Sequence, residues 1–193
     1  MPYSYSSFKK EIIDLVLQNF LNTKSRLLDV GSGSGKYGKI FQGKYNYVID
    51  AVEVFKPYIV KYKLHENYNN VYNIDLRNFD WPKGKYSLVI MGDVFEHLTV
   101  EDAQKFLNKS EKLDANVIIQ LPFKLTQGKI QNNTFERHLQ PDLTENIMKT
   151  RYPKLKNLGT KTEKTSGFEG MGLYYLETTT KLKKNEFKSR KLF

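Results

Sequence analysis

The chain has 193 residues, of which 39% are hydrophobic and 13% aromatic, and its formal net charge is +10. This length and composition favour one globular domain with its own core and exclude a disordered chain. The absence of cysteine excludes a disulfide framework and a thiolate metal site. No apolar run approaches membrane-spanning length, and the start of the chain lacks the pattern of a secretory signal. We therefore expect a cytoplasmic protein without a membrane span.

The basic charge is concentrated near the C-terminus. Residues 181–193 contain six lysines or arginines and a single glutamate. Such a segment could attract nucleic acid or another anionic partner, or it could be a solvated terminus. We expect one domain, residues 1–180, followed by a basic tail, residues 181–193. Within the domain, residues 1–25 hold an N-terminal helix and residues 26–180 form the core. The sequence gives no prediction of the oligomeric state.

Hydrophobic spacing predicts alternating helices and strands along most of the chain. Apolar residues three and four apart predict helices over residues 8–21, 36–42, 100–113 and 141–152, with short helices after Pro57 and from about Val94. Apolar runs between turn residues predict strands over residues 26–30, 47–54, 71–76, 86–91 and 116–121, the last one stopped by Pro122. We expect a long ordered loop over residues 122–140, and loops of this length are often functional.

The last segments predict a closing β-hairpin. Residues 155–163 and 173–180 are strand-like, and a long connection that contains glycine joins them. Strands that alternate with helices form parallel sheets through βαβ units. The sequence therefore predicts an α/β fold with a doubly wound, mostly parallel sheet and a C-terminal antiparallel hairpin.

A glycine-rich turn follows the first predicted strand, where residues 29–35 have the pattern D-x-G-x-G-x-G. Its three glycines let a ligand approach the backbone, and the helix that follows offers free N–H groups. A dinucleotide fingerprint would need glycine in place of Lys36, and a P-loop would need a hydroxyl residue in place of Ile40. Neither of these two nucleotide-binding patterns fits.

This turn resembles motif I of the class I S-adenosylmethionine-dependent methyltransferases. The order of strands and helices over residues 26–180 is similar to the seven-stranded, Rossmann-like fold of that family. The resemblance implies an enzyme that binds S-adenosylmethionine at the carboxyl ends of the strands. It implies that Glu53 accepts hydrogen bonds from the ribose hydroxyls, that Asp75 contacts the adenine amine, and that Gly92 lies beside the methionine part. The cofactor-binding residues implied are Asp29, Gly31, Ser32, Gly33, Tyr37, Glu53, Val54, Asp75, Leu76 and Gly92.

A second motif, D-V-F-E-H, follows the fourth predicted strand. If a helix begins there, Asp93, Glu96 and His97 lie on one face. Carboxylates and imidazoles can bind a divalent metal such as Mg²⁺ or Mn²⁺, and His138 in the long loop could be a fourth ligand. The pattern resembles the E-x-x-E-H site of the small-RNA 3′-terminal ribose methyltransferases and of the ubiquinone-pathway O-methyltransferases. Asp93 replaces the first glutamate of that site and is shorter by one methylene.

The same residues also allow chemistry without a metal. His97 or His138 would then be the general base, because a neutral imidazole accepts a proton near pH 7. Glu136 could orient His138 or bind substrate hydroxyls, or it could only pair with Arg137 at the surface.

Together the motifs predict a metal-assisted O-methyltransferase that acts on a sugar hydroxyl of a glycan or nucleotide-sugar. The long loop offers amides, a lysine and aromatic residues, which suit a polyol. The ribose 2′-hydroxyl of RNA, favoured by the basic tail, and a small phenol or quinone precursor are alternative acceptors. A cofactor-binding interaction subunit without catalysis is the alternative outside the enzymes.

Overall fold

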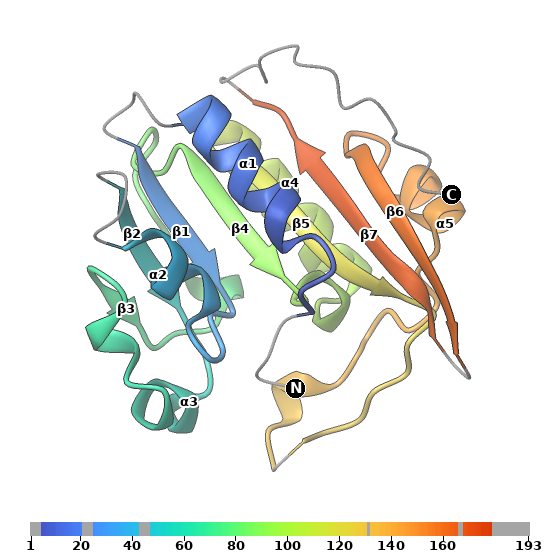
Figure 1. The fold of residues 1–193 in the computed structure, drawn as a ribbon, viewed down its shortest axis with the longest axis horizontal. Coiled ribbons are helices and arrows are strands. Elements are labelled where there is room, and N and C mark those ends of the chain that lie inside the picture. Colours follow the sequence, from blue (N-terminus) through green and yellow to red (C-terminus); the bar gives the residue numbers. More distant parts are fainter. Residues whose placement is uncertain (1–4, 21–24, 43–46, 131, 166–167, 179–193) are drawn as a thin grey trace.

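The structure is a computed structural model that describes residues 5–20, 25–42, 47–130, 132–165 and 168–178. A single seven-stranded sheet forms its middle layer (Figure 1). In order across the sheet, the strands are β3 (Val71–Tyr72), β2 (Val48–Val52), β1 (Arg26–Val30), β4 (Leu88–Gly92), β5 (Asn116–Phe123), β7 (Phe168–Leu176) and β6 (Lys156–Thr165). The basic tail predicted at residues 181–193 lies outside the described residues.

The direction of the strands divides the sheet into two parts. The first five strands of the chain pair in parallel, whereas β7 runs antiparallel to both β5 and β6. The predicted α/β fold with a mostly parallel sheet and a C-terminal hairpin is therefore confirmed. The carboxyl ends of β1, β2 and β4 lie at the same edge of the sheet, next to the switch in strand order between β1 and β4.

Helices cover both faces of the sheet. The helices are α1 (Lys9–Phe20), α2 (Lys36–Phe41), α3 (Lys56–Lys61), α4 (Val100–Lys112) and α5 (Glu145–Arg151), with 3₁₀ turns η1 (Leu64–Glu66), η2 (Leu76–Asn78), η3 (Phe95–His97) and η4 (Thr134–Glu136). One apolar cluster holds Ile12 of α1 and Phe41 of α2, and the other holds Phe106 of α4 and Met148 of α5. Successive residues of β4 alternate between the two clusters, which explains why that strand is apolar throughout.

Strand β5 does not stop at Pro122, as the sequence predicted, but continues to Phe123. The backbone groups of Asn116 and Gln120 bond toward the β4 side of β5. Pro122 lies two residues after Gln120, so its backbone faces the same side of β5. Gln120 pairs with Gly92, the last residue of β4, so β4 has already ended opposite Pro122. The N–H that proline lacks therefore has no ladder partner to lose.

The predicted long, glycine-containing connection in the hairpin is wrong, because residues 168–172 of it, with Gly170 and Gly172, lie in β7. A Cβ on Gly170 would lie 2.2 Å from the backbone oxygen of Lys161. One on Gly172 would lie 2.6 Å from the ring of Phe123. These glycines mark close approach between strands and not a loop.

Two further elements are shorter than predicted. Strand β3 ends at Tyr72, and Asp75 caps the 3₁₀ turn η2 by accepting a hydrogen bond from the Arg77 N–H. The helix expected from Val94 is only the turn η3, because the chain becomes extended at Leu98 and Thr99 caps the new helix α4.

Candidate active site

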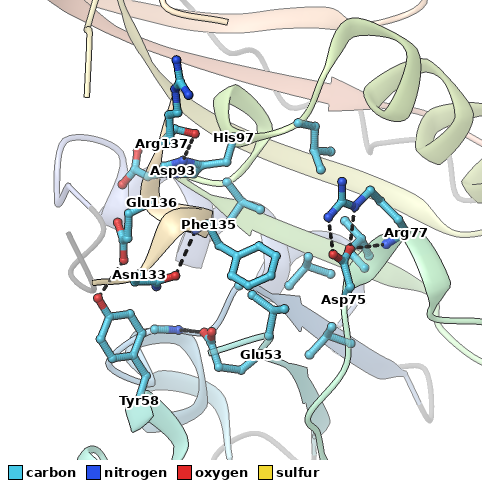
Figure 2. A pocket seen from close by; sticks show the side chains of 18 of the residues that line it. Glu53, Tyr58, Asp75, Arg77, Asp93, His97, Asn133, Phe135, Glu136 and Arg137 are labelled. Carbon is cyan, nitrogen blue, oxygen red and sulfur yellow. Dashed lines mark hydrogen bonds and ion pairs between the residues drawn. The ribbon is translucent and has the colours of Figure 1, made fainter. Parts of the chain in front are cut away.

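A cavity of about 320 Å³ opens at the carboxyl ends of β1, β2 and β4. One wall consists of the strand ends and the turns that follow them, and residues 133–137 of the loop after β5 form the opposite wall (Figure 2). The predicted long loop therefore contributes directly to the site. Among the described helices, none is long and apolar enough to cross a membrane.

The glycine turn forms the floor of this cavity. Gly31 has a positive φ of 64°, and its N–H donates to the backbone oxygen of Val52 at 2.8 Å. A Cβ at Gly31 would lie 2.5 Å from a methyl carbon of Val94. Only glycine fits both this backbone conformation and the close contact with Val94. The local structure therefore requires glycine at this position of the motif.

Glu53 joins the glycine turn to the end of β2. Its carboxylate accepts hydrogen bonds from the N–H groups of Gly33 and Phe55, each at 2.8 Å. Burial raises the pKa of Glu53, although these two bonds oppose the rise. Each carboxylate oxygen has a second lone pair, and Glu53 lines the cavity. Its position therefore permits it to accept further hydrogen bonds from a ligand.

The structure separates the predicted cofactor residues into two groups. Those that line the cavity are Gly31, Gly33, Glu53, Val54, Asp75, Leu76 and Gly92. Asp29, Ser32 and Tyr37 do not line it. Asp29 is buried behind the turn, where it accepts a hydrogen bond from the Tyr68 hydroxyl at 2.5 Å, and burial raises its pKa to about 7. That same hydroxyl accepts the N–H of Gly38, so Asp29 supports the turn from behind.

Asp75 lies at the cavity wall but already has a cationic partner. Its Oδ1 accepts hydrogen bonds from the backbone N–H and the Nε of Arg77, both at 2.9 Å. These contacts hold the pKa of Asp75 below its usual value. The contact of Asp75 with an adenine amine stays a prediction.

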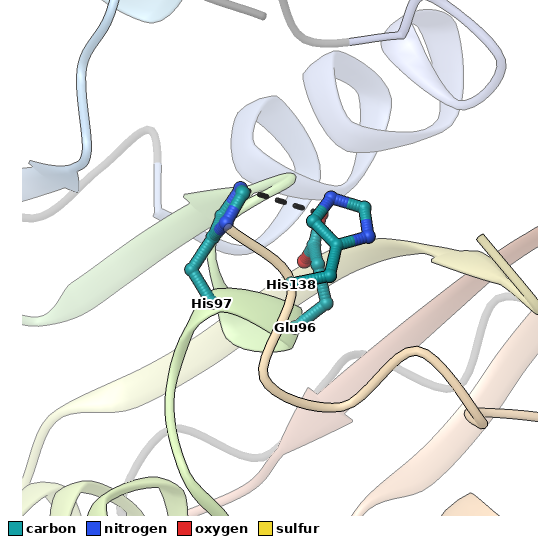
Figure 3. A group of neighbouring side chains, drawn as sticks. All are labelled: Glu96, His97 and His138. Atoms are coloured by element: carbon teal, nitrogen blue, oxygen red, sulfur yellow. Dashed lines mark ion pairs between the residues drawn. The ribbon is translucent and has the colours of Figure 1, made fainter. Parts of the chain in front are cut away.

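Glu96, His97 and His138 form a compact group beside the cavity (Figure 3). The Nε2 atoms of both histidines lie 3.9 Å from Oε1 of Glu96. The Nδ1 atom of His97 lies 3.1 Å from the backbone oxygen of Arg137, and that of His138 lies 2.7 Å from the backbone oxygen of Leu125. Only His97 of the three lines the cavity.

The hydrogen bonds of this group determine which atoms carry protons. A backbone oxygen can only accept, so each histidine carries its proton on Nδ1 and directs an unprotonated Nε2 toward Glu96. Burial lowers the pKa of His97 to about 4 and lowers that of His138, so both rings are neutral. Burial raises the pKa of Glu96, and neither of its oxygens has a hydrogen-bond partner among the described residues. Three acceptors that face one another need a cation or a shared proton.

The structure does not bring Asp93 into this group. Without the expected helix, Asp93 has a positive φ of 57°. Its carboxylate accepts the N–H of Tyr5 at 2.6 Å and the side-chain amide of Gln120. Burial raises the pKa of Asp93 to about 6. Its predicted role as a metal ligand stays a prediction.

Glu136 is buried and contacts a residue that the sequence analysis did not identify. The hydroxyl of Tyr58 donates to Oε1 of Glu136 at 2.9 Å, across 78 residues of chain (Figure 2). The side chain of Gln127 donates to the backbone oxygen of Glu136 at 2.7 Å. Phe135 and Arg137 also line the cavity. Neither Tyr58 nor Gln127 belongs to a recognisable motif, so only the fold could reveal them.

Comparison with known families identifies the chain. Residues 6–167 match the sequence profile of the AdoMet-dependent proline di-methyltransferases. The chain belongs to this family. It is an S-adenosylmethionine-dependent methyltransferase, and the enzyme class and cofactor predicted from the glycine turn are confirmed. The resemblance of the D-V-F-E-H motif to the metal-using methyltransferases stays a prediction.

Individual relatives agree with this class. An rRNA adenine N-6-methyltransferase of Limosilactobacillus reuteri is 30% identical over 118 residues, which cover 59% of this chain and 48% of that protein. The chain thus spans about half the length of that curated relative. A methyltransferase of Clostridium acetobutylicum has a TM-score of 0.64 at 13% identity, covering 91% and 92% of the two chains. The 1,6-didemethyltoxoflavin-N1-methyltransferase of Burkholderia thailandensis, crystallised with S-adenosylhomocysteine, has a TM-score of 0.61 at 14% identity, covering 89% and 78%. At these identities the solved structures support the fold alone.

Proposed function

We propose that this methyltransferase transfers its methyl group to an oxygen of a vicinal diol, specifically a sugar hydroxyl of a glycan or nucleotide-sugar, with help from a divalent metal. The observation that supports the proposal most is the convergence of Glu96, His97 and His138, whose ligand atoms all lie within 4.8 Å of one another. Bound S-adenosylmethionine supplies an electrophilic methyl group on its sulfonium. The protein must therefore align the acceptor oxygen and accommodate its proton.

The residues around the cavity fit the cofactor. Gly31 and Gly33 of the glycine turn line the cavity, and a Cβ at Gly31 would lie 2.5 Å from a methyl carbon of Val94, which lines it too. Glu53 has free lone pairs at the cavity wall for the two ribose hydroxyls. Leu76 and Ile74 provide an apolar part of the lining, which suits the face of an adenine ring. The cofactor is confirmed by the family, and these residues are the ones that we propose to bind it.

The group of Glu96, His97 and His138 fits a divalent metal. A metal-ligating histidine typically donates its other ring N–H to a backbone oxygen or a carboxylate, as both histidines do here. Two imidazoles and one carboxylate suit Mn²⁺ better than Mg²⁺, which prefers oxygen ligands. A metal in this group would lower the pKa of a coordinated hydroxyl and orient its neighbour. Without a metal, His97 would accept the proton, because it lines the cavity and its Nε2 is unprotonated.

A second candidate acceptor is an amine, because the family is described as proline di-methyltransferases. An amine nucleophile needs a base but no metal, and His97, which lines the cavity, is the proposed base. Two further expectations remain part of the proposal: nucleic acid as a partner of residues 181–193, and a cytoplasmic location.

The experiment measures methyl transfer from labelled S-adenosylmethionine to a panel of acceptors, with EDTA and after adding Mn²⁺ or Mg²⁺. The panel holds nucleotide-sugars and oligosaccharides with vicinal diols, an RNA oligonucleotide, a catechol and a peptide with an N-terminal proline. We expect transfer to a diol that EDTA abolishes and Mn²⁺ restores. Transfer to the proline peptide that is insensitive to EDTA would replace the first proposal with the second.

A further inference from the structure

We propose that Tyr58 is a positioning residue whose hydrogen bond to Glu136 holds the loop after β5 in the form that orients His97 and His138. The inference rests on the proposed function, because it concerns the same two histidines. It adds a residue on the opposite side of the cavity that no sequence motif indicates. Of the roles that the sequence allows for Glu136, it favours the orientation of His138 over the binding of substrate hydroxyls.

The Tyr58–Glu136 contact joins two elements on opposite walls of the cavity. Tyr58 lies in α3, directly after β2, and Glu136 lies in η4 after β5. The two side chains are 3% and 7% exposed, so their hydrogen bond is shielded from water. Burial and the bond to Glu136 raise the pKa of Tyr58 to about 12. The hydroxyl therefore remains a donor throughout the physiological pH range.

The position of Glu136 is transmitted to His138 through Gln127. The side-chain amide of Gln127 donates to the backbone oxygen of Glu136, and its own backbone oxygen accepts the N–H of His138 at 3.0 Å. The segments 125–127 and 136–138 are thus bonded to each other. A shift of Glu136 would pull on the segment that carries His138.

The same loop supplies the backbone oxygens that hold both imidazoles. His97 donates to Arg137, the residue after Glu136, and His138 donates to Leu125. These two bonds keep the proton on Nδ1 and leave Nε2 free to face Glu96. If the loop moved, the neutral rings could take the other tautomer, and the group would lose its arrangement of facing acceptors.

The contact also connects the histidines to the cofactor cavity. Phe135 directly precedes Glu136, lines the cavity (Figure 2) and is 45% exposed as a residue. A ligand in the cavity and the Tyr58–Glu136 contact would therefore favour the same position of the loop. Cofactor binding and the orientation of the histidines become one coupled equilibrium.

The test compares Tyr58→Phe with Tyr62→Phe as a matched control. Tyr62 is the C-cap residue that follows the same helix, and it does not line the cavity. Calorimetry measures the affinity for S-adenosylhomocysteine, and long-range ¹H–¹⁵N NMR reads the ring tautomers of the three histidines in the chain. We expect Tyr58→Phe to bind about threefold to tenfold more weakly, with mixed tautomers at His97 and His138. The control should match the wild type in both measurements.

Variants of Glu136 separate positioning from catalysis. Glu136→Gln keeps an oxygen acceptor for Tyr58 and should preserve both the tautomers and the affinity. Glu136→Ala should reproduce Tyr58→Phe, and the double variant should be no worse than either single one. Wild-type tautomers and affinity in Tyr58→Phe, with an unchanged melting temperature, would overturn the inference. A wild-type protein that does not bind S-adenosylhomocysteine would instead overturn the cofactor site itself.

Discussion

At the scale of single residues, Glu53 combines a structural and a binding role. Its carboxylate fixes the N–H groups of Gly33 and Phe55 and still faces the cavity. We expect Glu53→Ala to weaken S-adenosylhomocysteine binding by roughly 10- to 100-fold, because charge-assisted hydrogen bonds to both ribose hydroxyls are lost. Calorimetry provides the measurement, with the exposed Glu101→Ala as control. An unchanged affinity with an intact fold would remove Glu53 from the ribose site.

Glu96 illustrates a conflict between stability and function. Its carboxyl group is buried and has no hydrogen-bond partner among the described residues, which costs free energy in the metal-free protein. We expect Glu96→Met, a change of similar volume, to raise the free energy of unfolding by about 1–3 kcal/mol and to abolish Mn²⁺ binding. Urea unfolding with EDTA and titration with Mn²⁺ measure the two effects. A destabilised variant would show that the carboxyl group has a partner in solution.

Sequence reasoning found the residues of the site whose positions follow from the strand ends. Glu53 and Gly92 could be predicted in this way because parallel strands end at one edge of the sheet. It could not predict the direction of Asp93, which depends on a positive φ and on the N–H of Tyr5, 88 residues away. The contact of Tyr58 with Glu136 joins residues 78 positions apart, so no local sequence pattern predicts it.

At the scale of elements, caps determine where the helices begin. Thr99 accepts a hydrogen bond from the Asp102 N–H at 3.1 Å, starts α4 and so limits η3 to one turn. We expect Thr99→Ala to lower the free energy of unfolding by about 1 kcal/mol, whereas Thr99→Ser keeps the cap. Urea unfolding of the two variants measures the difference. Equal stability of Thr99→Ala and the wild type would show that the cap contributes nothing.

Elements that are defined by local apolar spacing were predicted well, whereas features that depend on contacts with distant strands were not. Strand β1 was predicted well because it is a short apolar run beside a turn, and helix α1 because its apolar residues repeat at the spacing of one helical face. Pro122 and Gly170 were wrongly predicted to lie outside strands, because their structural roles depend on neighbours in β4 and β6. A proline at the end of a paired region and a glycine at a close approach resemble loop residues in sequence alone.

At the scale of the whole molecule, the buried Asp29 makes stability depend on pH. Asp29 lies in the interior strand β1, and its pKa is about 7 because burial outweighs the hydrogen bond from Tyr68. Glu53 raises this pKa further, and Lys36 lowers it. A carboxyl group whose pKa is higher in the folded state takes up a proton on folding. The contribution of Asp29 to the free energy of unfolding is fully present below about pH 4 and is lost as the pH rises to about 7.

We therefore expect Asp29→Asn to remove a pH dependence on the order of 4 kcal/mol between pH 4 and 7. The amide can still accept the Tyr68 hydroxyl but cannot ionise, so the variant should gain stability relative to the wild type as the pH rises. Urea unfolding at intervals of one pH unit measures this difference. The lowered pKa values of His97 and His138 act in the opposite direction in both proteins, so they cancel when the two curves are subtracted. A difference that does not change with pH would mean that Asp29 has an ordinary pKa, and that the glycine turn is supported by a charged carboxylate.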